Sequence, residues 1–281
     1  MKPFRFPFAK HVILRVTFLL LIFTSGTATP AQTKHALVAA DIHATDNQAD
    51  PKHLTIPAGT ILPVILNQGF STKNPHASQA ITGRVAQDVP LPNGGMLGAG
   101  AKVRGTILSV SAVGKNAGAK ISFRFTEIEI QHRMIPIVAD LRALASFMEI
   151  QFAQTPETSP EFGTPYRWAT TDQIGGDVKY GVDGPVTDSG GETVGRGTDG
   201  GVLVRVTKQS GSACRRGDFD GGDRLQALWV FSSDACGVYG MPGVKILHAG
   251  RTEPLGEIVL SSETGEVNVR AGAGLLLRLI E

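Results

Sequence analysis

A short pattern that occurs three times limits how this chain can fold. Each copy has an Ala-Gly step, then a small residue, then an apolar run, and the steps are Ala58-Gly59, Ala99-Gly100 and Ala271-Gly272. Glycine tolerates the positive φ of a tight turn or bulge, so each copy predicts a sharp turn that leads into a β-strand. One copy lies near the start and one near the end, so we expect the first and last strands to pair in one closed sheet.

The rest of the chain also favours strands and turns. It contains 34 glycines among 281 residues and few aromatic residues, and runs with helical periodicity are scarce. Ile121, Phe123 and Phe125 alternate with polar residues, which predicts a strand with one buried face. The apolar phase then shifts, which predicts a bulge near Thr126-Glu127, followed by a turn at residues 131–133. We expect an antiparallel meander of about five strands in this part of the chain.

Two later segments are less regular. Residues 141–154 fit both a helical stripe and a strand, and we interpret them as a short helical turn that runs into a strand. Residues 155–201 are rich in Gly, Pro, Asp, Ser and Thr. A stretch of this length and composition is either a functional loop or a flexible one.

Residues 1–31 have the features of a secretory signal peptide. Basic residues precede an apolar run at 16–23, and small residues follow, with cleavage expected after Ala28 or Ala31. A retained membrane anchor is the alternative, but Arg15 leaves the run shorter than the roughly 20 residues that a span requires. We therefore expect a periplasmic or extracellular protein with no membrane span in the mature chain and a flexible leader at 32–53.

Charge and cysteine content limit the partners and the compartment. Four of the 27 basic residues lie in the signal segment, which leaves 23 basic against 25 acidic residues, so we expect no nucleic-acid partner.

Cys214 and Cys236 are an even pair, as expected for a disulfide in an oxidising compartment. Such a bond would stabilise the fold by roughly 3 kcal/mol. Two cysteines at this spacing exclude a Cys-x-x-Cys motif and a cysteine zinc site.

Several short motifs match known sites only in part. The glycines of residues 195–200 fit G-x-G-x-x-G, but neither the preceding strand nor the following helix of a dinucleotide site is predicted. The acidic run at 218–223 lacks the closing carboxylate of a calcium loop. Arg216-Gly217-Asp218 spells an adhesion tripeptide, and a surface adhesin is a third hypothesis. No metal-ligand or nucleophile motif occurs, so we expect no enzyme activity, cofactor or metal.

Three aromatic residues of the glycine-rich segment are the best candidates for a contact surface: Tyr166, Trp168 and Tyr180. Aromatic residues in loops that lie on a rigid sheet often contact ligands, although they also fasten loops to the core. Trp and Tyr stack on sugars. An extracellular hydrolase or a carbohydrate-binding module with its site in the 166–198 loop is therefore the alternative function.

Three runs resemble the β-barrel domain of the TrbI/VirB-type conjugation scaffold: Ile56-Pro-Ala-Gly-Thr-Ile-Leu-Pro-Val-Ile-Leu66, Ala80-Ile-Thr-Gly-Arg-Val85 and Gly98-Ala-Gly-Ala-Lys-Val-Arg-Gly105. The match covers roughly residues 54–140, and residues 269–279 are similar to the closing strand of that barrel. The resemblance implies a periplasmic domain that assembles in rings within an envelope-spanning secretion complex. Residues 236–240 and 248–254 are similar to uncharacterised secreted bacterial proteins.

Together these features predict an all-β, mainly antiparallel fold. We expect a small barrel at 54–140 that is closed by the C-terminal strand within 256–281, and a glycine-rich, disulfide-containing insertion at 141–255. The predicted function is that of an exported, non-enzymatic cell-envelope protein. It would act as a scaffold or assembly component that binds itself or another envelope protein.

Overall fold

The computed structural model describes residues 56–73, 78–114, 118–158, 163–207, 224–247 and 254–280, with Tyr166 described by its backbone alone. The expected signal peptide at 1–31, the leader at 32–53 and the motifs at 216–223 lie outside these residues. Cys214 also lies outside them. No cysteine of the described part is free, and the expected pairing of Cys236 with Cys214 stays a prediction because Cys214 is not among the described residues.

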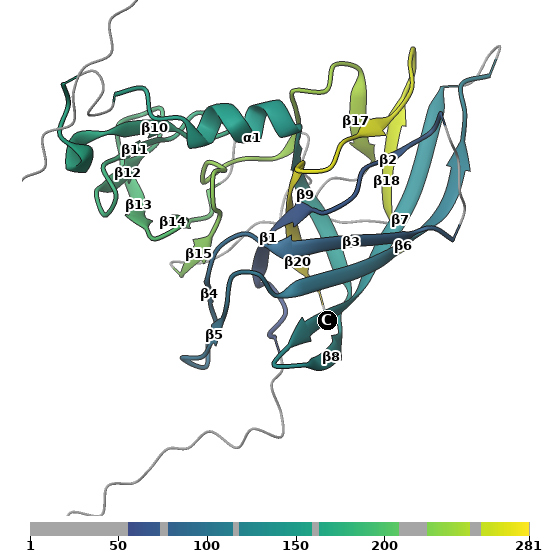
Figure 1. Cartoon of the computed structure of the whole chain (residues 1–281), viewed down its shortest axis with the longest axis horizontal. Helices are drawn as coiled ribbons and strands as arrows, with labels where there is room; N and C mark the ends of the chain where they lie inside the picture. Colours follow the sequence, from purple (N-terminus) through teal and green to yellow (C-terminus); the bar gives the residue numbers. More distant parts are fainter. Residues whose placement is uncertain are drawn as a thin grey trace, which may run out of the picture. The chain divides into compact units, whose positions relative to one another are not determined.

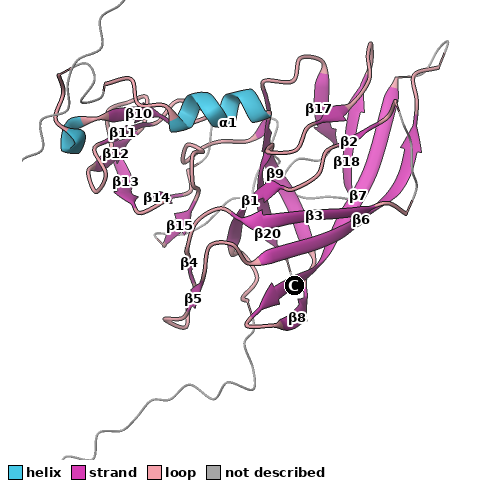
Figure 2. Cartoon of the chain, viewed as in Figure 1, coloured by secondary structure: helices cyan, strands magenta, loops and turns pink. Residues whose placement is uncertain are grey.

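About half of the described chain is in strands (Figure 1, Figure 2). The largest sheet contains β1 (Ile61–Leu66), β3 (Ala80–Val85), β6 (Lys102–Ser111), β7 (Ala119–Ile130), β8 (Arg133–Pro136), β9 (Ala139–Ala145), β16 (Gly237–Tyr239), β17 (Val244–Leu247), β18 (Ile258–Ser262) and β20 (Gly274–Leu279). A second sheet contains β10 (Thr170–Asp172), β11 (Val178–Tyr180), β12 (Pro185–Thr187), β13 (Thr193–Thr198), β14 (Gly201–Arg205) and β15 (Leu225–Ala227). The remaining elements are the pairs β2 (Phe70–Ser71) with β19 (Asn268–Val269) and β4 (Val89–Pro90) with β5 (Met96–Leu97), the helix α1 (Phe147–Gln154) and the 3-10 helix η2 (Tyr166–Trp168).

The largest sheet forms a nearly closed barrel, which confirms the predicted fold class. Nine strands follow one another in the order β16-β9-β20-β1-β3-β6-β7-β18-β17, and β8 pairs with β7 beside this path. All pairings in it are antiparallel except the parallel pair of β16 and β9. The two ends of the path, β16 and β17, are consecutive in the chain.

The C-terminal strand closes the barrel next to the first strand, as the sequence predicts. β20 lies between β9 and β1 (Figure 1). Its antiparallel register with β1 runs from the pair of Ile61 and Arg278 to the pair of Ile65 and Gly274. The barrel therefore joins segments that are more than two hundred residues apart in the sequence.

The three Ala-Gly steps share one backbone geometry. Gly59, Gly100 and Gly272 have φ values of 81°, 85° and 81°, within the left-handed region that favours glycine. Each glycine donates its N–H at 2.8 Å to the carbonyl oxygen of a residue at the end of a neighbouring strand, and these acceptors are Leu279, Val85 and Leu66. In each case the acceptor residue also donates its own N–H to the carbonyl oxygen of the residue that follows the glycine. This arrangement is a G1 bulge, so the repeated sequence encodes a repeated turn.

The predicted irregularity of β7 is also present. Arg104 of β6 pairs with Glu127 and Gly105 pairs with Phe125, so Thr126 is the extra residue of a bulge. After β7, Gln131 and His132 have positive φ values of 49° and 62° and form the expected turn into β8.

The interpretation of residues 141–154 had the order of its elements wrong. The strand β9 comes first and the helix α1 follows. The Oγ of Ser146 accepts a hydrogen bond of 3.3 Å from the N–H of Glu149, and this N-cap places the start of the helix after the strand. All seven residues of β9 are buried, including Arg142. A charged residue inside a buried strand interrupts the apolar pattern by which such a strand is recognised in a sequence.

The segment expected as an insertion contributes to both sheets. β9, β16 and β17 belong to the barrel sheet, and β10 to β13 lie within the stretch interpreted as a long loop. Those four strands are three to six residues long and are separated by glycine turns. Short strands of small and polar residues show no alternation that could be recognised in the sequence.

Two apolar clusters explain why β1, β9 and β20 are buried on both faces. Alternate residues such as Leu62 and Leu277 point into the barrel. Their neighbours, such as Ile61 and Leu276, pack in a second cluster with α1 and with Val202 and other residues of the second sheet. Among the described residues, no helix has the length and apolar character needed to cross a membrane.

Candidate functional site

The predicted aromatic contact residues lie at one end of the second sheet. Trp168 is 61% exposed and Tyr180 is 45% exposed. Their segments are joined by a hydrogen bond of 2.7 Å from the N–H of Gly181 to the carbonyl of Ala169. The guanidinium carbon of Arg167 lies 5.4 Å from the centre of the Trp168 ring. Trp168 and Tyr180 therefore have exposed side chains on adjacent segments. The side chain of Tyr166 is not among the parts that the structure describes.

A groove beside α1 was not predicted. A pocket of about 230 Å³ lies between the start of this helix and β19, with Phe147, Met148, Met241, Asn268 and Arg270 among its lining residues. We call these five residues the α1 groove. Phe147 is 37% exposed and Met148 is 49% exposed. Phe152, one turn after Met148, is also exposed, so the helix presents an apolar side to solvent.

A second hollow of about 480 Å³ adjoins the α1 groove. The two hollows share Asn268 and Arg270, and Phe70 and Gln79 line the far side of the second one. The guanidinium of Arg270 makes no hydrogen bond or ion pair with any residue in the described part of the chain. The arrangement combines an apolar pocket with an available cation, which suits a ligand that carries both an apolar group and an acidic group.

The contact between the barrel and the second sheet depends on a buried glutamine. The Oε1 of Gln87 accepts a hydrogen bond of 2.7 Å from the N–H of Trp229, and its Nε2 donates to the carbonyl of Val202 at 2.8 Å. Trp229 has a φ of 56°, which is unusual for a bulky residue and requires support from its surroundings. The two bonds of Gln87 give part of that support.

Arg142 stabilises the loop that follows Trp229. Its guanidinium donates to the carbonyl oxygens of Ala235 at 2.7 Å, Ser233 at 3.2 Å and Thr207 at 3.4 Å. Burial lowers the pKa of Arg142 to about 10, although the negative charge of Asp234 opposes this shift. The side chain binds backbone rather than facing a cavity that could hold a ligand, so we assign it a structural role.

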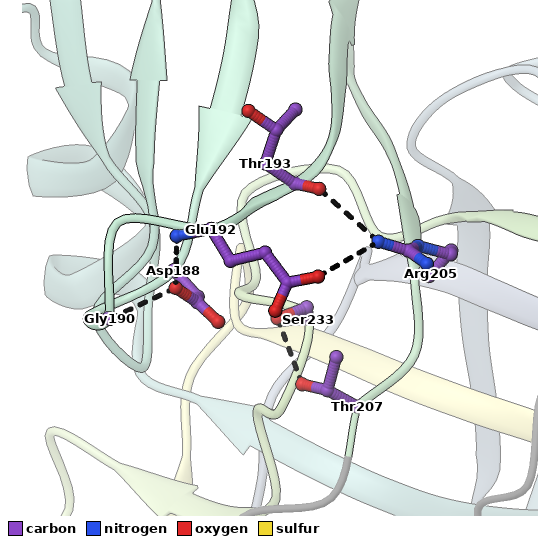
Figure 3. A network of polar contacts seen from close by, with 7 residues as sticks. All are labelled: Asp188, Gly190, Glu192, Thr193, Arg205, Thr207 and Ser233. Atoms are coloured by element: carbon purple, nitrogen blue, oxygen red, sulfur yellow. Dashed lines mark hydrogen bonds and ion pairs between the residues drawn. The ribbon is translucent and has the colours of Figure 1, made fainter.

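A polar network continues from this loop to the hairpin of β12 and β13 (Figure 3). The Oγ1 of Thr207 donates to the Oγ of Ser233 at 3.1 Å, and Arg205 forms an ion pair of 3.4 Å with Glu192. The Oδ1 of Asp188 accepts bonds from the N–H groups of Gly190 and Glu192, both at 2.9 Å, which fixes the hairpin turn.

Asp177 is a buried acid at the same loop. Its Oδ2 accepts a bond of 2.6 Å from the N–H of Ser233. Burial raises the pKa of the Asp177 carboxyl, and the bond from Ser233 opposes that change. We therefore expect the stability of the fold to depend on pH. The hydroxyl of Ser233 lies beside the carboxyl, but the one histidine of the described ranges, His132, lies in the turn between β7 and β8.

The described residues bring together no nucleophile, base and acid in a catalytic arrangement. His132 is the one histidine among them and is exposed in the turn between β7 and β8. No cluster of three or more His, Cys, Asp or Glu side chains within the described ranges could hold a metal ion. The glycines of residues 195–200 lie in the hairpin of β13 and β14, where Gly195 and Gly197 allow close approach of neighbouring backbone.

A scan against protein-family models and searches of curated proteins and solved structures find no match to this chain.

Proposed function

We propose that this chain is an exported, non-enzymatic protein of the cell envelope that binds a protein partner through the α1 groove. The observation that carries the proposal is the apolar side of α1, which lies beside a pocket with an available arginine. Solvent-exposed Phe and Met side chains cost free energy in water, and such groups next to a pocket are typical of binding surfaces.

Three further features support this proposal. The expected signal peptide indicates export, and the resemblance to the TrbI/VirB-type scaffold barrel favours a role in assembly. The closed sheet and the Ser146 cap hold α1 in a fixed position, which reduces the entropy lost when a partner binds. The partner is either a second copy of the chain or another envelope protein, and one experiment separates the two.

Site-specific photo-crosslinking in cells tests the proposal. A photoreactive residue in place of Met148 should give a crosslinked product of defined mass, equal to a dimer for self-association and different for another partner. Met96 is the matched control, because it is a methionine that is 59% exposed and lies on β5 outside the groove. The absence of any product at 148, or the same products at 148 and 96, would reject the proposed function.

The exposed aromatic residues favour a second candidate, a carbohydrate-binding module. Trp168 is 61% exposed, and Tyr180 lies on the adjacent segment. Binding on a glycan array that is lost in Trp168→Ala, with unchanged thermal stability, would support this function. A blank array together with inactive hydrolase screens would remove it.

A further inference from the structure

Another pocket of about 230 Å³ lies between α1 and β10, and it shares Glu149 with the pocket of the α1 groove. Many of its lining side chains carry oxygen atoms, and these are Glu149, Thr155, Glu157, Asp172 and Gln173. Its described lining contains no histidine or cysteine. Hard cations such as Ca²⁺ prefer a donor set of this kind.

The backbone brings two of these carboxylates together. The N–H of Glu157 donates to the carbonyl of Thr170 at 2.8 Å, so the segment that carries Glu157 runs beside β10, which carries Asp172. The Oγ1 of Thr158 also accepts a bond of 3.1 Å from the N–H of Thr170. Glu157 and Asp172 both line this pocket. Two adjacent carboxylates repel each other unless a proton or a cation lies between them.

Gln173 provides an independent observation in the same pocket. Its side chain is 4% exposed, and its Oε1 has no hydrogen-bond partner among the described residues. The Nε2 of the same amide donates to the Oγ1 of Thr171 at 3.4 Å, which orients the group. A buried amide oxygen without a partner is unfavourable, and a bound cation would satisfy it.

We propose that this pocket binds Ca²⁺ through the carboxylates of Glu157 and Asp172 and the amide oxygen of Gln173, with water completing the coordination. Two carboxylates are few for a calcium site, so we expect a dissociation constant of about 10⁻⁴–10⁻³ M, as in extracellular calcium modules. The ion would link the segment after α1 to β10. Mg²⁺ should bind more weakly, because it requires a stricter octahedral geometry than this set of ligands offers.

Calcium titration of the purified full chain tests this inference by calorimetry and thermal unfolding. We expect Ca²⁺ to raise the melting temperature, and the double variant Glu157→Gln/Asp172→Asn to lose that response. Without Ca²⁺ the double variant should melt no lower than the wild type, because the repulsion is removed. The control Asp183→Asn/Asp199→Asn changes the net charge equally at two exposed residues and should keep the response.

Gln173→Met separates the amide ligand from the two charges. It should weaken Ca²⁺ binding severalfold and leave the calcium-free melting temperature close to that of the wild type. The proposal is overturned if about 10 mM Ca²⁺ changes nothing, or if binding survives in Glu157→Gln/Asp172→Asn. The crosslinking at position 148 does not depend on Ca²⁺, so the two proposals can fail separately.

Discussion

The N–H of Gly59 donates a hydrogen bond of 2.8 Å to the carbonyl oxygen of Leu279, and Leu279 donates in return to Thr60 at 2.9 Å. At the other end of the same strand pair, Gly272 donates to Leu66 at 2.8 Å. β1 and β20 are therefore joined by a glycine bulge at each end. The contact has a very large sequence separation, so we expect it to form late and to make unfolding of the barrel cooperative.

Glycine-to-alanine substitution at these bulges should reveal two different costs. Gly59→Ala meets open space, so its cost is the positive φ alone, about 1–2 kcal/mol of unfolding free energy. Gly272→Ala has the same φ, and its Cβ would lie 2.6 Å from the Cδ2 of Phe147. We expect Gly272→Ala to lose clearly more stability than Gly59→Ala in urea unfolding.

A second substitution checks the physical cause of this difference. Phe147→Leu in the Gly272→Ala background should recover part of the loss, whereas it should give no recovery with Gly59→Ala. Equal losses for the two alanine variants would show that the contact with Phe147 is easily relieved.

Gln87→Leu should weaken the contact between the barrel and the second sheet. The substitution leaves the buried N–H of Trp229 without a partner and removes one of two bonds to the carbonyl of Val202, which keeps the bond from Leu228. We expect this to cost about 1–3 kcal/mol in denaturant unfolding. Trp229 fluorescence should change as well. Gln151→Ala, at an exposed position of α1, is the control and should have little effect. A loss no greater than that of the control would show that water replaces both bonds.

The barrel could be predicted because its signals are local and repeated. The three Ala-Gly steps, the phase shift at Thr126 and the turn at Gln131 and His132 each follow from a few neighbouring residues. β9 was harder to predict, because Arg142 is a charge in a strand that is buried on both faces. Its burial depends on the carbonyls of Thr207, Ser233 and Ala235, which no local pattern shows.

The candidate sites were harder to predict than the fold. Trp168 and Tyr180 could be chosen because aromatic residues in a polar, glycine-rich stretch suggest a surface. The α1 groove combines Met148 with Arg270, and the calcium pocket combines Glu157 with Asp172. Each pair comes from separate segments, so only the folded chain places them together. The one local signal was the Ser146-x-x-Glu149 spacing, in which the serine caps the start of α1.

Ser146→Ala should destabilise α1 and the groove that it carries. The variant leaves the N–H of Glu149 without its cap, and removal of an N-cap typically costs about 0.5–2 kcal/mol. Ser146→Asp should keep the cap and most of the stability. Thermal unfolding of both variants measures this, together with crosslinking at position 148. Equal stability of the alanine and aspartate variants would mean that the helix start is fixed by packing alone.

Asp177→Asn should change how stability depends on pH. Burial raises the folded-state pKa of Asp177 above its ordinary value, so the folded protein binds this proton more readily than the unfolded chain. The cost of the buried charge is therefore fully present at neutral pH. It is relieved as the pH falls from the raised pKa towards the ordinary carboxyl value of about 4. Asn can still accept the bond from Ser233 and carries no charge, so it should lack this relief.

Urea unfolding from pH 7 to pH 4 should show the wild type gaining stability relative to Asp177→Asn as the pH falls. A constant difference between the two proteins across that range would mean that Asp177 has the same pKa in the folded and unfolded states.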